Sequence, residues 1–115
     1  MTEKQIIGKI GEDAACRYLE EQGYRIVQTN FRCKTGEIDI ICQREGCTVF
    51  IEVKTRKNRN YGSAAEFVDF RKQQKVKRAA MFYIKNADAD MRFDVVEVYH
   101  SNGNITEINH IENAF

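Results

Sequence analysis

The chain has 115 residues, of which 43% are hydrophobic and 30% charged, and its formal net charge is +1. This length allows one domain with one core, and the composition is ordinary for a soluble globular protein. The apolar runs are too short to cross a bilayer, and the N-terminus lacks the apolar run and cleavage site of a signal peptide. We therefore expect a cytoplasmic protein.

The first predicted element is a helix that begins after Thr2, where Thr2 and Gln5 form a capping-box pattern, and ends at about Gln22, before Gly23. Small and apolar residues recur on one face at helical spacing, which favours close packing on a sheet. Glu12 lies at the border of that face. It is either a surface acid or a side chain that reaches over the edge of the sheet.

Three strands are predicted next. Residues 24–30 form the first strand and residues 31–35 a loop, and residues 36–56 read as two strands joined by a tight turn at Glu45-Gly46-Cys47. Strict alternation places Ile38, Ile40 and Cys42 on one face of the hairpin. Four polar side chains then gather on the other face if the polar faces of the two strands coincide: Glu37, Asp39, Glu52 and Lys54.

This polar patch predicts a metal site. Two carboxylates about 4 Å apart repel each other by roughly 4 kcal/mol at an effective dielectric near 20, so Asp39 and Glu52 need a cation, a shared proton or heavy solvation. Hard oxygen ligands suit Mg²⁺ or Mn²⁺. Lys54 lies two residues beyond Glu52 and could hold a phosphate or an attacking water. The plain alternative is a solvated sheet face whose acids pair with nearby lysines.

The C-terminal half begins with a polar stretch, residues 55–67, which is either a loop that closes on a ligand or an ordinary surface loop. Asp69 is the expected N-cap of a helix to about Lys85, although Ser63 offers an earlier start. Lys72 lies in its apolar sector and is expected to point toward the sheet. Strands over residues 92–99 and 105–108, joined by a turn, complete the order α-β-β-β-α-β-β, a mixed α/β sheet flanked by helices.

The distribution of charges and cysteines indicates which partners and metal sites to expect. Residues 54–78 hold nine Lys or Arg and two acids, which favours a polyanionic partner, although a solvated helix face is the commoner cause of such a pattern. The four cysteines form no C-x-x-C pair and lie far from both histidines, which makes a zinc site improbable. We expect free thiols, as is usual in a reducing cytosol.

With these residues in place, the chain resembles the PD-(D/E)XK nuclease superfamily, whose fold is restriction-endonuclease-like. In that superfamily an acid on the second core strand and an E-x-K on the third bind the metal, and Asp39 and Glu52-Val53-Lys54 match them. Archaeal Holliday-junction resolvases add a glutamate from the first helix, which Glu12 matches. Lys72 and Gln73 match a position that often points into the site. The proline of the superfamily name is replaced here by Ile38.

The chain is also similar to the YraN-like family of small, largely uncharacterised bacterial proteins. The motifs that carry this similarity span roughly residues 8 to 98, and they are G-x-x-G-E-D-A-A, N-F-R, G-E-I-D-I-I, V-F-I-E-V-K-T-R, R-K-Q and R-F-D-V-V. Several motifs in the same order make the match specific to the family.

The resemblance implies one nuclease-like domain over residues 1–115 and an Mg²⁺- or Mn²⁺-dependent endonuclease that hydrolyses DNA, with branched DNA as an expected substrate and a homodimer as the expected assembly. Asp39, Glu52 and Glu12 would hold the metal, and Lys54 would orient or deprotonate the attacking water. The expected nucleic-acid contacts are Arg56, Lys57, Arg59, Lys72, Gln73 and Lys75.

Two other functions fit the same residues. The basic surface would serve a non-catalytic nucleic-acid-binding module, an adaptor in a repair, uptake or RNA-processing complex, whose binding depends on salt but not on Mg²⁺. The small size and near-neutral net charge would also suit an interaction domain with a protein partner. Fold alone does not decide among the three, because one fold hosts many functions.

Overall fold

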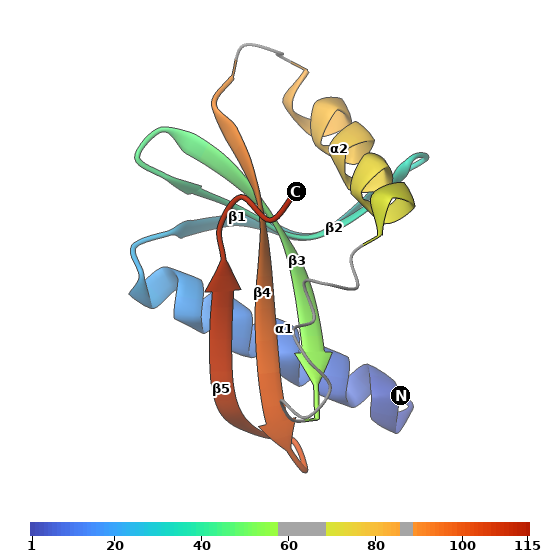
Figure 1. Cartoon of the computed structure of the whole chain (residues 1–115), viewed down its shortest axis with the longest axis vertical. Helices are drawn as coiled ribbons and strands as arrows, with labels where there is room; N and C mark the ends of the chain where they lie inside the picture. The colour runs from blue at the N-terminus through green and yellow to red at the C-terminus, as the bar shows by residue number, and fades with distance from the viewer. Residues whose placement is uncertain (58–68, 86–88) are drawn as a thin grey trace.

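The computed structural model of the chain describes residues 1–57, 69–85 and 89–115 (Figure 1). The elements in chain order are α1 (Glu3–Glu21), β1 (Arg25–Cys33), β2 (Gly36–Arg44), β3 (Cys47–Arg56), α2 (Phe70–Ile84), β4 (Met91–Ser101) and β5 (Asn104–Ile111). The predicted order α-β-β-β-α-β-β is confirmed.

The strands form one mixed sheet in the order β1-β2-β3-β4-β5. Strands β3 and β4 are parallel, and every other neighbouring pair is antiparallel. Helix α1 packs on one face of the sheet through Ala14, Ala15 and Leu19, and α2 packs on the other through Val76 and Ala79. Figure 1 shows α1 crossing behind the sheet and α2 lying beside the β2 end of it. The protein is therefore a helix–sheet–helix sandwich with a core on each side of the sheet.

Both helices begin at the predicted caps. The Thr2 side chain accepts a hydrogen bond from the Gln5 amide while the Gln5 side chain accepts one from the Thr2 amide, which completes the capping box of α1. Asp69 caps α2 by accepting from the amide of Lys72 at 2.8 Å. The alternative start at Ser63 lies outside the described residues.

The first hairpin differs from the prediction. Residues 31–33 belong to β1 rather than to a loop, because Phe31, Arg32 and Cys33 pair with Ile38, Glu37 and Gly36 across a two-residue turn. Polar residues interrupt the apolar pattern there, so periodicity alone ended the predicted strand too early. Strand β3 likewise extends to Arg56, and the rest of the predicted loop (58–67) lies outside the described residues.

The predicted alternation along β2 is wrong at one point. Ile40 and Cys42 belong to the core under α1, whereas Ile38 belongs to the core under α2. Opposite this point in β1, Asn30 has a φ of 54°, the left-handed conformation that Asn tolerates better than most residues. Asn30 therefore kinks β1, and opposite it the alternation of β2 breaks at Asp39, just beyond the last β2–β3 pair.

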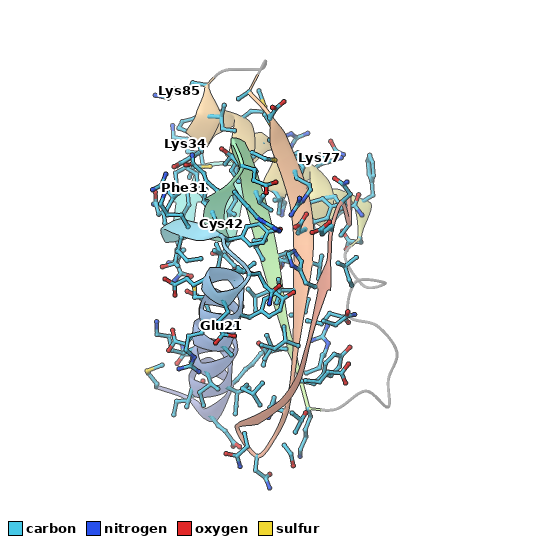
Figure 2. The ribbon with its side chains drawn as sticks, turned by 90° about the vertical axis from the view of Figure 1, so that its left-hand side faces the viewer. Glu21, Phe31, Lys34, Cys42, Lys77 and Lys85 are labelled. Carbon is cyan, nitrogen blue, oxygen red and sulfur yellow. The ribbon has the colours of Figure 1, made fainter. Side chains whose placement is uncertain are left out.

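None of the helices in the described ranges is long and apolar enough to span a membrane. The four cysteines are free thiols, and Cys42 is fully buried under α1. Figure 2 shows the sheet from the side, with Cys42 inside the molecule and Phe31 and Lys34 on the β1–β2 hairpin.

Candidate metal and nucleic-acid site

The site is built where β2 and β3 separate. The regular β2–β3 pairs run from Arg44 and Cys47 to Ile40 and Ile51. Beyond that pair, Oδ2 of Asp39 accepts a hydrogen bond of 2.8 Å from the backbone amide of Val53. The Asp39 side chain of β2 thus takes the hydrogen bond that a backbone carbonyl would accept from β3. This places the Asp39 carboxylate beside Glu52.

Glu52 is the buried centre of the site. Its side chain is 5% exposed, and its Oε1 lies 2.6 Å from Nζ of Lys72 and 3.3 Å from Nζ of Lys54. The two lysines come from α2 and β3, so one carboxylate oxygen ties the helix to the strand. A buried carboxylate needs such partners, because leaving the charge unpaired would cost several kcal/mol.

The two carboxylates repel each other strongly. Burial and the neighbouring charge of Glu52 raise the pKa of Asp39 to about 7, against the opposing effects of the Val53 amide and of Lys72. Although burial lowers it, the contact with Glu52 holds the pKa of Lys72 above its ordinary value. The Asp39 carboxyl therefore gains or loses its proton near neutral pH.

An open hollow of about 600 Å³ lies over this pair. Its floor is formed by Asp39, Glu52, Lys54 and Lys72, and its rim by Thr55 and Arg56 of β3 and by the first turns of α1. The expected gathering of Asp39, Glu52 and Lys54 is therefore present in the structure. Glu37 lies to one side, paired with Arg32 at 3.4 Å near the surface.

Glu12 borders a second hollow of about 610 Å³, which shares Asp39, Val53 and Thr55 with the first. Its Oε1 accepts a hydrogen bond of 2.9 Å from the Asn30 side chain. Across residues 1–57, 69–85 and 89–115, no three Asp, Glu, His or Cys side chains come close enough together to hold a metal ion. A metal contact by Glu12 therefore stays a prediction.

The carboxylates of Asp39 and Glu52 are ligands of the kind that a hard divalent cation prefers. Mg²⁺ and Mn²⁺ are commonly held by one or two carboxylates, with water and substrate phosphate completing the shell, and Asp39 with Glu52 supplies that minimum set. The repulsion that raises the pKa of Asp39 is the physical reason a cation would be favoured there. Lys72 now supplies part of that positive charge to Glu52.

The expected nucleic-acid contacts are spread around this hollow. Arg56 and Lys57 are exposed at the end of β3, Lys75 borders a cleft at the start of α2, and Gln73 is half-buried on α2. Arg59 lies outside the described residues. Lys72 points into the carboxylate pair, as its place in the apolar sector of the helix predicted.

Two further positions support the site. Asn30 kinks β1 opposite Asp39 and orients Glu12. It was missed from the sequence, although an Asn inside a predicted strand is a signal that could have identified it. Gly11 brings α1 against β3, since a Cβ at this position would overlap the Thr55 side chain. This contact confirms the close packing on a sheet that was predicted from the small residues of this helix face.

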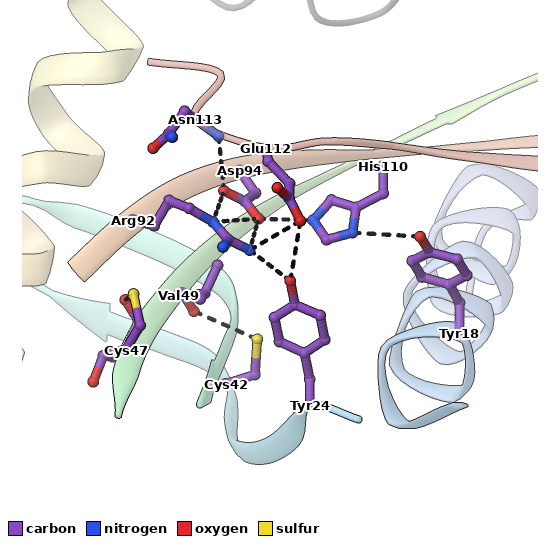
Figure 3. A network of polar contacts seen from close by, with 11 residues as sticks. Tyr18, Tyr24, Cys42, Cys47, Val49, Arg92, Asp94, His110, Glu112 and Asn113 are labelled. Carbon is purple, nitrogen blue, oxygen red and sulfur yellow. Dashed lines mark hydrogen bonds and ion pairs between the residues drawn. The ribbon is translucent and has the colours of Figure 1, made fainter. Parts of the chain in front are cut away.

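A second polar cluster lies elsewhere. Asp94 is fully buried and accepts hydrogen bonds from Arg92, from Nε2 of His110 at 2.7 Å and from the amide of Asn113 (Figure 3). With Asp94 ionised, Nε2 of His110 carries the proton, and the Tyr18 hydroxyl lies 3.4 Å from Nδ1. Arg92 and Asp94 form an ion pair on β4, and the hydrogen bond from the Asn113 amide to Asp94 anchors the C-terminal segment to this strand.

Comparison with known proteins places the chain in a family. The model of "Uncharacterised protein family UPF0102" matches residues 11–98. A UPF0102 protein of Caldanaerobacter subterraneus subsp. tengcongensis is 44% identical, with 97% of this chain and 96% of the relative covered. One of Caldicellulosiruptor bescii is 44% identical (95% and 96% covered), and one of Nocardia farcinica is 39% identical (98% and 91%). The YraN-like assignment is confirmed: the chain belongs to the UPF0102 family.

Proposed function

We propose that this protein is a metal-dependent endonuclease with a restriction-endonuclease-like, PD-(D/E)XK site that hydrolyses DNA phosphodiesters. The observation that carries the proposal is the Asp39–Glu52 pair, two repelling carboxylates at the floor of an open hollow with Lys54 beside them. A structural ion pair alone does not require a second buried carboxylate next to the first.

Each residue has a defined part in that reaction. Asp39 and Glu52 would hold an Mg²⁺ or Mn²⁺ ion, whose positive charge would polarise the phosphoryl oxygen. Lys54, 17% exposed in the same hollow, orients or deprotonates the attacking water. Lys72, which contacts Glu52 at the edge of the same hollow, would contact a phosphate of the substrate. Arg56 and Lys57 bind the backbone on the rim, and Glu12 contributes as a further ligand, directly or through water.

Backbone contacts carry no sequence information, so the proposed selectivity is for DNA structure, with branched DNA the first choice. A branched substrate cut on two strands would suit a homodimer, since symmetric cutting needs two copies of the site. The proposed location is the cytoplasm, as expected from the sequence.

The test is a cleavage assay on labelled four-way, flap, linear duplex and single-stranded DNA with Mg²⁺ or Mn²⁺. Asp39→Asn and Glu52→Gln should abolish cleavage while the circular dichroism spectrum stays native. Glu45→Gln, which changes an exposed acid at the β2–β3 turn, is the matched control and should cut like the wild type. Wild-type cleavage by Asp39→Asn would refute the site.

A second function, a non-catalytic nucleic-acid-binding module, is favoured by one observation. Glu52 is already paired with Lys54 and Lys72 in the described structure, so its buried charge is compensated without a metal. In that case the basic surface would bind nucleic acid with strong salt dependence. Binding would then be the same in Mg²⁺ and in EDTA, and no substrate would be cut.

A further inference from the structure

The outer face of α2 combines basic and apolar side chains. At 3.6 residues per turn, the exposed residues of α2 all fall within a sector of about 140° that contains neither Val76 nor Ala79. This sector, here called the α2 outer face, consists of Phe70, Arg71, Gln74, Lys75, Arg78, Met81 and Phe82. Phe70 is 73% exposed and Phe82 is 55% exposed, unusual values for such large apolar side chains.

The charge on α2 indicates which kind of partner its outer face would bind. The helix sequence contains Arg71, Lys72, Lys75, Lys77 and Arg78 and no acidic residue. Two copies of such a helix would repel each other, which disfavours a dimer formed by α2 against α2. A polyanion is complementary to this face.

The basic face also leads to the carboxylate pair. A cleft of about 380 Å³ at the start of α2 is lined by Arg71, Lys72 and Lys75 and by Gly36 and Glu37 of the neighbouring hairpin. Lys72 borders both this cleft and the hollow over Glu52. Because Gly36 lies close to the Lys75 backbone, the helix and the hairpin are held together at this point. A chain bound along α2 would therefore arrive at the proposed site.

We propose that the α2 outer face binds a single-stranded segment of nucleic acid, with phosphates on Arg71, Lys75 and Arg78 and unpaired bases stacked on Phe70 and Phe82. Exposed aromatic rings among basic side chains are the combination that binds single strands, because bases in a duplex already stack on one another. The two rings are twelve residues apart, about 18 Å along the helix, which leaves room for several nucleotides. This inference rests on the proposed function and narrows its substrate to nucleic acid with an unpaired stretch.

A membrane surface is the competing partner for a basic helix with aromatic residues. Helices that lie in a membrane interface place their apolar residues on one face and their charges on the other. Here Arg78 and Arg71 lie between Phe70 and Phe82 around the helix, and the true apolar face is buried on the sheet. The helix could not insert its rings into lipid without also inserting both arginines.

The experiment is fluorescence anisotropy with labelled dT20 in EDTA, where the metal site plays no part. Phe70→Ala and Phe82→Ala should each weaken binding about fivefold or more, and Phe70→Trp should retain it. The double variant Arg71→Gln/Arg78→Gln should lower the slope of log K against log salt by about 1.4, roughly 0.7 for each lost phosphate contact. The matched controls on α1, Ile6→Ala (45% exposed) and Arg17→Gln, should bind like the wild type.

Three further ligands separate the outcomes. A 20-base-pair duplex should bind with no difference between Phe70→Ala and the wild type. Labelled U20 assigns RNA if it binds tighter than dT20, and DNA if it binds more weakly. Wild-type affinity for dT20 in both alanine variants would overturn the proposal, as would binding to anionic phosphatidylglycerol vesicles that the same variants abolish. Failure of DNA cleavage would count against the proposed enzyme alone, because this binding is measured without metal.

Discussion

The backbone amide of Val53 donates a hydrogen bond of 2.8 Å to Oδ2 of Asp39, across a gap where β2 and β3 are no longer paired. This contact fixes the Asp39 carboxylate on the strand that carries Glu52 and Lys54. The fold itself thus holds two acids together against their repulsion. Most of the chemistry expected of the site follows from that arrangement.

The first prediction concerns the pH dependence that Asp39 imposes on folding. Its pKa is about 7 in the folded protein and near 3.8 without the fold, so the folded state holds the extra proton between these values. The contribution of this proton to the free energy of unfolding is therefore complete below about pH 4 and is lost as the pH rises through 7. At about 1.4 kcal/mol per pKa unit, the loss is on the order of a few kcal/mol.

Urea unfolding of the wild type and of Asp39→Asn at pH 5 and pH 8 measures this effect. Asparagine does not titrate, so the stability of the variant relative to the wild type should improve from pH 5 to pH 8. A difference between the two proteins that stays constant over this range would contradict a pKa near 7. Mn²⁺ added at pH 8 should stabilise the wild type and leave Asp39→Asn unchanged, if the proposed cation site exists.

The second prediction concerns Lys72. Its positive charge lowers the pKa of Asp39, so Lys72→Met should raise that pKa further. Lys75→Met removes an equal charge one turn along α2 and is the control. Carbon-13 NMR of the aspartate carboxyl groups follows the titration directly. If the Asp39 carboxyl titrates at the same pH in both variants as in the wild type, the ammonium group of Lys72 does not affect the pKa of Asp39.

Much of this site could be predicted from strand periodicity. A hairpin with acids at Asp39 and Glu52 places them on neighbouring strands whatever the details of the turn, and Lys54 follows Glu52 on the same face. The position of Lys72 in the apolar sector of a helix also indicated that it points toward the sheet. These predictions depend only on regular helix and strand geometry, which the chain obeys over most of its length.

The missed features are the places where regular geometry fails. The kink at Asn30 moves Ile38 to the core opposite that of Ile40, and no period-two pattern can contain such a break. Close packing of the small residues of α1 on the sheet was predicted, but not that Gly11 would meet Thr55, 44 positions away in the sequence. Glu97 is another example, since it is fully buried on β4 and accepts hydrogen bonds from Tyr99 and Asn109. Tertiary packing decides these details.

The third prediction tests the approach of α1 to the site. In Gly11→Ala the new methyl group would overlap the Thr55 side chain, so the variant should lose about 1–3 kcal/mol of stability despite its better helix propensity. Gly8→Ala, with nothing near its new methyl group, should gain up to about 1 kcal/mol. Urea unfolding compares the two. A Gly11→Ala protein as stable as Gly8→Ala would mean that α1 is not held closely against β3.

The fourth prediction concerns the buried cluster at Asp94. Although burial raises it, the hydrogen bonds from His110, Arg92 and the Asn113 amide hold the pKa of Asp94 below its ordinary value. A lowered pKa means that the stabilising contribution of the carboxylate is present above about pH 4 and is lost as the pH falls further. Asp94→Asn should lose about 3–5 kcal/mol at pH 7, because it leaves the Arg92 charge without its buried partner.

Glu112→Gln is the matched control for Asp94→Asn. Glu112 also pairs with Arg92, at 3.6 Å, but its side chain is 56% exposed, so water compensates for its loss and the cost should stay below about 1 kcal/mol. Urea unfolding at pH 7, 5 and 3 should show the deficit of Asp94→Asn shrinking toward pH 3, because the unfolded wild type takes up a proton there that the folded carboxylate resists. A deficit that is equal at all three values would show that Asp94 stabilises the C-terminal segment by packing, and that its charge contributes nothing.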